Sequence, residues 1–385
     1  MTSKLDTLCS YAKSKVAVDT LTVKNYVSTE NMIPDKCGIT DASSLPSVQY
    51  TQQYLRDDVL VSNIRPYFKK IWKAEYDGGC SNDVLVFRAK DDCDPTFLFY
   101  LLADDNFFNY ATATAKGTKM PRGDKSAIMQ YSVPVFDIDT QKKIGALLWS
   151  IDQKVRLNNQ INENLQQQAQ TLFKAWFVDF TPYDGSMPDH WSIVPMSSVA
   201  RISTEVFSPQ KNPNVEVEHY SIPAYDESHY PVFEISDGIK SNKYKLTANS
   251  VIVSKLNPDT KRIWRPYCLS NNPICSTEFI VYEPVSSTYR DYVYSIIDSA
   301  GFSVFLCSHT TGSTNSRQRV SPSVTLNYNV VLPDEEVLKH FCAIVSPMYE
   351  TIENNILENQ KLTKTRDTLL PKLMSGEIDV SDIDI

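Results

Sequence analysis

Lysine and arginine residues gather at two kinds of place in this sequence: directly after short β-branched runs, and around Gly-Thr or Gly-Ser turns. Aromatic residues such as Tyr67, Trp72 and Trp264 are interleaved with them. Closely spaced cations attract anions, so these patches are expected to bind a polyanion. The residues expected to form this surface are Arg65, Lys69, Lys70, Lys119, Arg122, Lys255, Lys261, Arg262, Arg317 and Arg319.

A solvated face is the alternative interpretation of either patch taken alone, because lysine and arginine are mostly exposed in any protein. Equivalent patches follow the Val59–Ser62 run and the Val251–Ser254 run. This recurrence at matched positions favours binding over simple solvation.

No known catalytic or metal-binding motif is found in the sequence. A Gly-rich phosphate loop, a G-x-S-x-G elbow and an H-E-x-x-H pair are all missing. The spacing of the five histidines does not indicate a shared site, and Cys307 and His309 lack partners at zinc-finger spacing. The eight cysteines include no C-x-x-C pair and are expected to be free thiols. We therefore expect neither a catalytic site nor a metal site, and no cofactor on this chain.

Length and composition indicate an ordinary globular protein of two or more domains. The chain has 385 residues, of which 42% are hydrophobic and 22% charged, and its net charge is −8. An acidic total argues against a lone nucleic-acid binder, although the distribution of charge matters more than the sum. Neither an apolar run of about 20 residues nor a signal peptide is present, so we expect no membrane association and a cytoplasmic location.

One long amphipathic helix is predicted between Ile144 and Phe180, and the basic patches lie outside it. Its apolar or small residues are spaced alternately by three and four, as in a heptad seam. Asn158 and Asn162 occupy two steps of the seam. Such a helix would be roughly 50 Å long, which suits a strut. The other seam positions are Leu148, Ile151, Val155, Leu165, Ala169, Leu172 and Trp176.

A second copy of this seam begins at Val345, and Asn355 and Asn359 lie 197 residues after Asn158 and Asn162. The repeat extends upstream as three further matches. They are Val59–Ser62 with Val251–Ser254, Cys80–Phe87 with Cys275–Tyr282, and Gly117 to Arg122 with Gly312 to Arg317. The chain is therefore expected to run globular unit, helix, globular unit, helix, with each globular unit of mixed α and β structure.

Antiparallel pairing of the two helices predicts which seam residues face each other. If Asn158 faces Asn359, then Asn162 faces Asn355, and the other seam positions pair apolar residues except for Ile151 opposite Arg366. Facing asparagines satisfy each other's amides and penalise a slipped register. The alternative is that each helix packs on its own globular unit and the asparagines face water. Antiparallel helices would hold two inverted globular units tens of ångströms apart, suited to two separated stretches of duplex.

Two motifs on these helices resemble a known protein family. They are L-x-x-x-D-x-K at Leu148, Asp152 and Lys154 followed by LFKAWFVDF, and the C-terminal T-L-L-P-K-L-M-S-G-E-I. They are similar to the central and C-terminal conserved regions of specificity (S) subunits of type I restriction-modification systems. The resemblance covers the whole chain in the order recognition domain, conserved helix, recognition domain, conserved helix.

The resemblance implies a non-catalytic subunit that reads double-stranded DNA. Two target recognition domains would each read half of a bipartite, asymmetric sequence, and the conserved helices would form an antiparallel coiled coil that sets the spacer. Two methyltransferase (M) subunits and the restriction (R) subunits would be its partners, and S-adenosylmethionine, ATP and Mg would belong to those partners. The competing hypothesis is a coiled-coil scaffold that binds only proteins.

The predicted fold class is α+β, with two target recognition domains in tandem repeat related by a pseudo-twofold axis. The residues in the first half are divided into recognition domain 1 at 1–140, the central helix at 141–180 and a linker at 181–189. The second half comprises recognition domain 2 at 190–333, the C-terminal helix at 334–376 and an acidic, frayed tail at 377–385. Phe173 and Phe177 lie off the seam, so they either pack on a globular unit or contact an M subunit.

Overall fold

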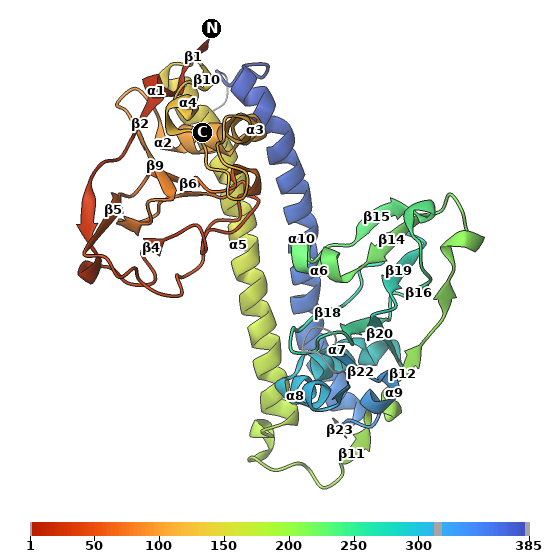
Figure 1. Ribbon diagram of the computed structural model, residues 1–385. Helices are drawn as coiled ribbons and strands as arrows, with labels where there is room; N and C mark the ends of the chain where they lie inside the picture. Colours follow the sequence, from red (N-terminus) through yellow and green to blue (C-terminus); the bar gives the residue numbers. More distant parts are fainter. Residues whose placement is uncertain (1, 312–317, 382–385) are drawn as a thin grey trace. The chain divides into compact units, whose positions relative to one another are not determined.

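The computed structural model describes residues 2–311 and 318–381. The chain divides into two compact units. Unit 1 comprises Met1–Val155 and Lys361–Ile385, and unit 2 comprises Arg156–Gln360. Two long helices, α5 (Ile138–Phe177) and α10 (Glu335–Ser375), each contribute part of their length to both units (Figure 1).

Unit 1 is built from short strands and a few helices. Its strands are β1 (Thr2–Lys4), β2 (Cys9–Tyr11), β3 (Lys15–Ala17), β4 (Tyr26–Val27), β5 (Tyr50–Tyr54), β6 (Val59–Ser62), β7 (Ile71–Lys73), β8 (Gly78–Cys80), β9 (Val84–Ala89) and β10 (Ser132–Pro134). Its α-helices before α5 are α1 (Leu5–Leu8), α2 (Pro95–Ala103), α3 (Asp105–Ala113) and α4 (Lys125–Ile128). Among its described residues are also the 3-10 helices η1 (Val18–Thr20) and η2 (Pro66–Phe68).

Strand β6 lies inside a four-stranded antiparallel sheet of order β2-β9-β6-β7. All four of its side chains are buried, because successive residues of a strand point to opposite faces and both faces are covered here. Val59 and Val61 pack in one core with Phe97 of α2, while Leu60 packs in another with Tyr54 of β5. A second sheet of order β3-β5-β8-β4 supplies that other core.

Unit 2 has more strands than unit 1. They are β11 (Ser192–Pro195), β12 (Ala200–Ser203), β13 (Val206–Phe207), β14 (Glu216–Tyr220), β15 (Val232–Ile235), β16 (Lys243–Lys245), β17 (Val251–Ser254), β18 (Ile263–Trp264), β19 (Pro273–Ser276), β20 (Phe279–Pro284), β21 (Thr310–Thr311), β22 (Arg319–Val320) and β23 (Asn329–Leu332). Its α-helices before α10 are α6 (Ile222–Ser228), α7 (Arg290–Asp298), α8 (Ala300–Ser308) and α9 (Pro322–Thr325). Its 3-10 helices are η3 (Thr181–Tyr183), η4 (Met196–Ser198), η5 (Pro209–Lys211), η6 (Ser236–Gly238) and η7 (Ser287–Tyr289).

The sheets of unit 2 repeat the topology of unit 1. The order β12-β20-β17-β18 matches β2-β9-β6-β7, and β13-β16-β19-β14 matches β3-β5-β8-β4. Each second sheet contains one parallel pair at the same place, β14 with β19 and β4 with β8. Unit 2 adds β15 at the edge. The predicted tandem repeat and the predicted α+β class are therefore confirmed.

The asparagine layers of α5 and α10 meet as the antiparallel register predicts. Asn158 Nδ2 donates to Asn359 Oδ1 at 2.9 Å, and Asn355 Nδ2 donates to Asn162 Oδ1 at 2.8 Å. A third bond, from Asn359 Nδ2 to Asn159 Oδ1 at 2.8 Å, was not expected. Asn158 is fully buried and Asn359 is 8% exposed, which rules out the alternative in which this layer faces water.

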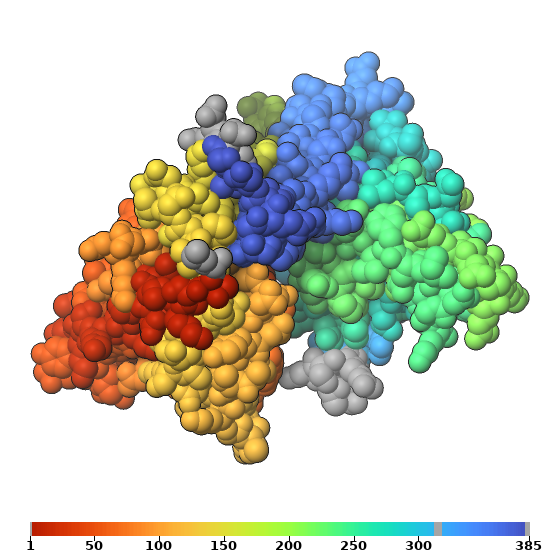
Figure 2. Space-filling model, turned by 90° about the horizontal axis from the view of Figure 1, so that it is seen from above, coloured from red at the N-terminus to blue at the C-terminus, as the bar shows by residue number. Residues whose placement is uncertain are grey.

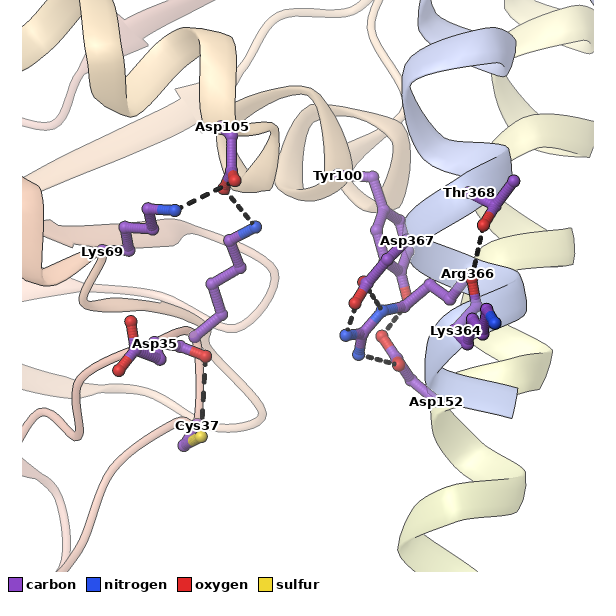
Figure 3. A network of polar contacts seen from close by, with 11 residues as sticks. Asp35, Cys37, Lys69, Tyr100, Asp105, Asp152, Lys364, Arg366, Asp367 and Thr368 are labelled. Atoms are coloured by element: carbon purple, nitrogen blue, oxygen red, sulfur yellow. Dashed lines mark hydrogen bonds and ion pairs between the residues drawn. The ribbon is translucent and has the colours of Figure 1, made fainter. Parts of the chain in front are cut away.

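Arg366, which the seam pairing sets opposite Ile151, forms an ion pair with Asp152 of α5. Its Nη1 donates to Asp152 Oδ1 at 2.7 Å, and the other carboxylate oxygen accepts a bond from Tyr100 Oη at 2.6 Å (Figure 3). Arg366 also pairs with its neighbour Asp367. An ionic layer within unit 1 thus accommodates the one seam position that does not pair two apolar residues.

The described part of the C-terminal segment, residues 377–381, is partly packed, in contrast to the frayed tail that its acidic composition indicated; residues 382–385 lie outside the described residues. Val380 is 1% exposed and belongs to the same core as Leu373 of α10 and Leu148 of α5. Figure 2 shows the last turns of α10, in dark blue, against the yellow segment that includes the start of α5. Within the described residues, no helix is long and apolar enough to cross a membrane.

Candidate nucleic-acid interface

The turn that follows β6 in unit 1 places aromatic and cationic side chains on the surface. Arg65 and Lys69 flank η2 and both have positive φ angles, 49° and 51°, which non-glycine residues seldom adopt. Tyr67 and Phe68 are 48% and 38% exposed, and the Arg65 guanidinium carbon lies 6.0 Å from the centre of the Phe68 ring. We call residues 65–69 the unit 1 turn.

A short hairpin packs against this turn. The backbones of Lys116 and Arg122 exchange hydrogen bonds at 2.8 and 2.9 Å. The backbone of Arg122 also forms an isolated antiparallel β-bridge with that of Ile64. Arg65 N donates to Pro121 O at 2.8 Å, which fixes the hairpin to the unit 1 turn. We call residues 116–122 the unit 1 finger; its Met120 is 45% exposed and its Lys119 is also exposed.

Asp105 of α3 holds two lysines next to the unit 1 turn. Lys36 and Lys69 reach its carboxylate at 2.8 and 2.9 Å (Figure 3). Burial on its own would raise the pKa of Asp105, but the hydrogen bonds from both lysines outweigh burial and lower it. One carboxylate between two ammonium groups leaves a net positive charge beside the exposed aromatics.

Two of the lysines expected to bind a polyanion pair with acceptors of the chain itself. Lys70 Nζ donates to Thr29 O at 2.6 Å, and burial lowers the pKa of its ammonium group. Lys261 pairs with Asp298, which also accepts bonds from Gln166 and Gln170 of α5. The acceptor of Lys70 is part-buried and Asp298 is buried, and the sequence alone does not reveal that they need a donor.

The remaining cations of unit 2 are distributed as follows. Arg262 makes a two-point pair with Asp226 at 2.6 and 2.8 Å, and Lys255 is half-buried directly after β17. Arg319 pairs with Glu278 at 3.0 Å. Arg317 lies outside the described residues.

The structural equivalent of Arg122 is Arg319, which corrects the match with Arg317 made from the sequence. Arg122 bridges Ile64 after β6, and Arg319 bridges Leu256 after the equivalent strand β17. Their acidic partners also correspond, since Arg122 pairs with Asp83 and Arg319 with Glu278. A two-residue difference in spacing between the repeats caused the mismatch, because the sequence match kept one offset through this region.

The two acids were missed as parts of the site. Asp83 and Glu278 were aligned with each other in the repeat, and an acid at the same place in both copies was the available signal. The sequence did not indicate that Asp83 and Glu278 pair with arginines, because the arginines lie 39 and 41 residues further along the chain.

Phe173 and Phe177 belong to the core of unit 2, which favours the first of the two alternatives, packing on a globular unit, over contact with an M subunit. They are 7% and 4% exposed. Phe177 packs against Tyr292 and Phe341 with ring centres 5.1 and 5.0 Å away. Side chains enclosed by α7 and α10 in this way leave little surface for a partner.

All eight cysteines are free, as predicted. Among residues 2–311 and 318–381, no group of three or more His, Cys, Asp or Glu side chains is arranged to hold a metal ion. Some of the charged groups described above are occupied in ion pairs, and the exposed cations of the unit 1 turn and the unit 1 finger form a surface that can bind a polyanion.

Comparison with known proteins gives one family match and two relatives that align over most of the chain. Residues 47–167 match the family described as the type I restriction modification DNA specificity domain. The chain is 23% identical to the MjaIX specificity subunit of Methanocaldococcus jannaschii, with 76% of this chain and 71% of that protein aligned. It is 22% identical to the HindI specificity subunit of Haemophilus influenzae, with 92% and 94% aligned.

A solved structure shares the fold. It is the S subunit of a type I restriction-modification system from M. genitalium, with a TM-score of 0.64 and 14% sequence identity. The superposition covers 99% of this chain and 96% of that one.

Proposed function

Because this chain belongs to the family of type I restriction-modification specificity subunits, we propose that its two units each read one half of a bipartite, asymmetric DNA target. As a specificity subunit it is non-catalytic, binds DNA and assembles with the other subunits of its complex. The recognition domains would be residues 1–140 and 190–333, joined by the linker at 181–189 and carried on the helices at 141–180 and 334–376.

One observation carries this proposal: both units place a hairpin against the loop that follows the same central strand. Unit 1 sets the finger against the loop after β6, and unit 2 sets the β21–β22 hairpin against the loop after β17. Two equivalent surfaces in one chain support two equivalent tasks. A target in two halves is what such a pair would read.

The charges of unit 1 support DNA as the ligand. Lys36, Lys69 and Lys119 lie near the exposed Tyr67 and Phe68, so cationic and apolar groups share one surface. Cations would hold phosphates and set the register, while the apolar and amide groups would touch base edges. The net charge of −8 is compatible with this arrangement if partner subunits supply much of the positive surface around the duplex.

The partners in this proposal are two M subunits and, through them, R subunits. S-adenosylmethionine, ATP and Mg would be bound by those partners, and the whole complex would act in the cytoplasm. The M subunits would dock on the conserved helices. Phe173 and Phe177 are excluded from that contact by their burial.

Protein scaffolding without DNA specificity is the second candidate. It accounts for the paired helices but not for the repeated hairpin and its cations. A scaffold would need no matched surface on both units.

The test uses the purified full chain in complex with its cognate M subunits. Duplexes with random sequence are offered to the complex, and the retained molecules are sequenced. We expect one enriched motif in two parts separated by an unspecified spacer. Retention without any enriched sequence, at a salt concentration where binding persists, would favour the scaffold.

A further inference from the structure

Among the residues that the structure describes, each unit contains one exposed arginine whose guanidinium meets a carboxylate at two points. In unit 1, Arg122 Nε lies 3.0 Å from Asp83 Oδ1, and Arg122 Nη2 lies 3.3 Å from Asp83 Oδ2. In unit 2, Arg319 Nε lies 3.0 Å from Glu278 Oε2, and Arg319 Nη2 lies 3.1 Å from Glu278 Oε1. Two parallel bonds fix orientation as well as distance, which a single contact does not.

The backbone around each pair is also the same. Asp83 O accepts from Asn63 N at 2.8 Å, and Glu278 O accepts from Lys255 N at 2.9 Å. Each acid therefore binds the loop after the central strand through its backbone and the hairpin arginine through its side chain. The acid links the loop to the hairpin in both units.

The pairs recur although the local sequences have diverged. Unit 1 uses Asp and unit 2 uses Glu, and the arginine follows the acid by 39 residues in one and by 41 in the other. An isolated exposed ion pair contributes little to stability, so stability alone gives little reason to keep the geometry while the side chains change. A requirement on the position of the hairpin gives such a reason.

We propose that the Arg122–Asp83 and Arg319–Glu278 pairs are positioning clamps, which hold the hairpin of each unit at the angle needed to read its half-site. This inference rests on the proposed function. Arg122 and Arg319 are then positioning residues and not DNA contacts. The DNA contacts of unit 1 lie elsewhere on the finger, at the exposed Lys119 and Met120.

The charge balance supports a clamp over a phosphate contact. Asp83 already engages the Nε and Nη2 donors of Arg122, and a phosphate in the same place would sit beside the carboxylate and be repelled. Lys119 is exposed and lies between Gly117 and Arg122 on the same finger.

The experiment measures the preference of the full chain, in complex with its M subunits, for each base of both half-sites. It also measures the salt dependence of binding. Arg122→Ala is expected to reduce the preference for bases in one half-site by about tenfold, comparable to the loss of one base contact. The other half-site and the salt slope are expected to be unchanged.

Exchange of the two charges separates a clamp from a direct contact. The double variant Arg122→Asp with Asp83→Arg keeps the pair in reverse and is expected to regain most of the lost preference. Arg319→Ala is expected to affect the opposite half-site only. Lys119→Ala is expected to lower the log–log salt slope by about one with base preference retained, as for a phosphate contact.

One control variant and one substitute variant keep the outcomes distinct. Arg56→Ala removes an exposed arginine elsewhere in unit 1 and is expected to change neither measurement. If Arg122→Ala lowers the salt slope by about one, or the exchanged pair fails to recover preference, Arg122 contacts DNA and the clamp is refuted. If the exchanged variant does not fold, Asp83→Asn takes its place, because it keeps the shape of the side chain and weakens the ion pair. An unchanged half-site preference in Asp83→Asn also refutes the clamp. A wild-type complex without any base preference would refute the proposed function itself.

Discussion

The ionic layer in unit 1 yields a quantitative prediction about Arg366. Replacing Arg366 with Met removes the bond to Asp152 while keeping most of the apolar stem. Asp152 would then hold a negative charge with the hydrogen bond from Tyr100 as its remaining compensation in this layer. The layer is neither exposed nor fully buried, since the side chains of Arg366 and Asp152 are 25% and 24% exposed.

The expected loss follows from that intermediate exposure. Exposed pairs contribute at most about 1 kcal/mol, and breaking a buried pair costs about 3–5 kcal/mol. A pair one quarter exposed should therefore cost about 2 kcal/mol when Arg366 is removed. Adding Asp152→Asn removes the uncompensated charge and keeps an acceptor for Tyr100, so the double variant should lose about 1 kcal/mol.

The measurement is chemical unfolding of the full chain, followed by hydrogen exchange in α2, which carries Tyr100. Lys364→Met is the matched control, because Lys364 is exposed on the same helix, and it should change stability by less than about 0.5 kcal/mol. Equal losses for Arg366→Met and Lys364→Met would refute the ionic layer. So would a double variant whose loss equals the sum of the single losses, because coupled residues are not additive.

Three further predictions concern single side chains. Burial lowers the pKa of His219 below 6.5, so the protein should lose stability as the pH falls below that value, because the unfolded chain gains a proton there before the folded chain does. His219→Gln should therefore reduce the dependence of the melting temperature on pH between pH 7 and 5. An unchanged pH dependence would contradict this. Phe177→Ala should lower the free energy of unfolding, measured in urea, by about 3–5 kcal/mol. Wild-type stability together with loss of M-subunit co-purification would instead indicate that Phe177 contacts an M subunit. Gly78→Ala would place a Cβ 2.2 Å from the Asn25 carbonyl oxygen, so its melting temperature should fall, and an unaltered melt would argue against this close approach.

The long helices were predictable because their signal is periodic and local. A heptad seam and its second copy fix both the helix and its partner, and Asn158 opposite Asn359 then follows from counting. The sheet topology was not predictable, because strands of three or four residues carry little pattern and pair across long loops.

The candidate site was predicted in part, for a related reason. The repeat located the loop after β6 and its equivalent after β17, but not the two-residue shift that makes Arg319 the counterpart of Arg122. Charge patterns also cannot tell an outward cation from one that satisfies a buried acceptor, as Lys261 does with Asp298. The burial of Phe177 and Val380 likewise depends on the tertiary fold and could not be predicted from the local sequence.

The most direct test of the central claim is base-resolution sequencing of DNA methylation in cells with and without this gene, in the presence of an active cognate M subunit. The account predicts that adenine methylation at one two-part motif disappears when the gene is removed and returns with the full chain. Identical methylation in both cells would contradict it.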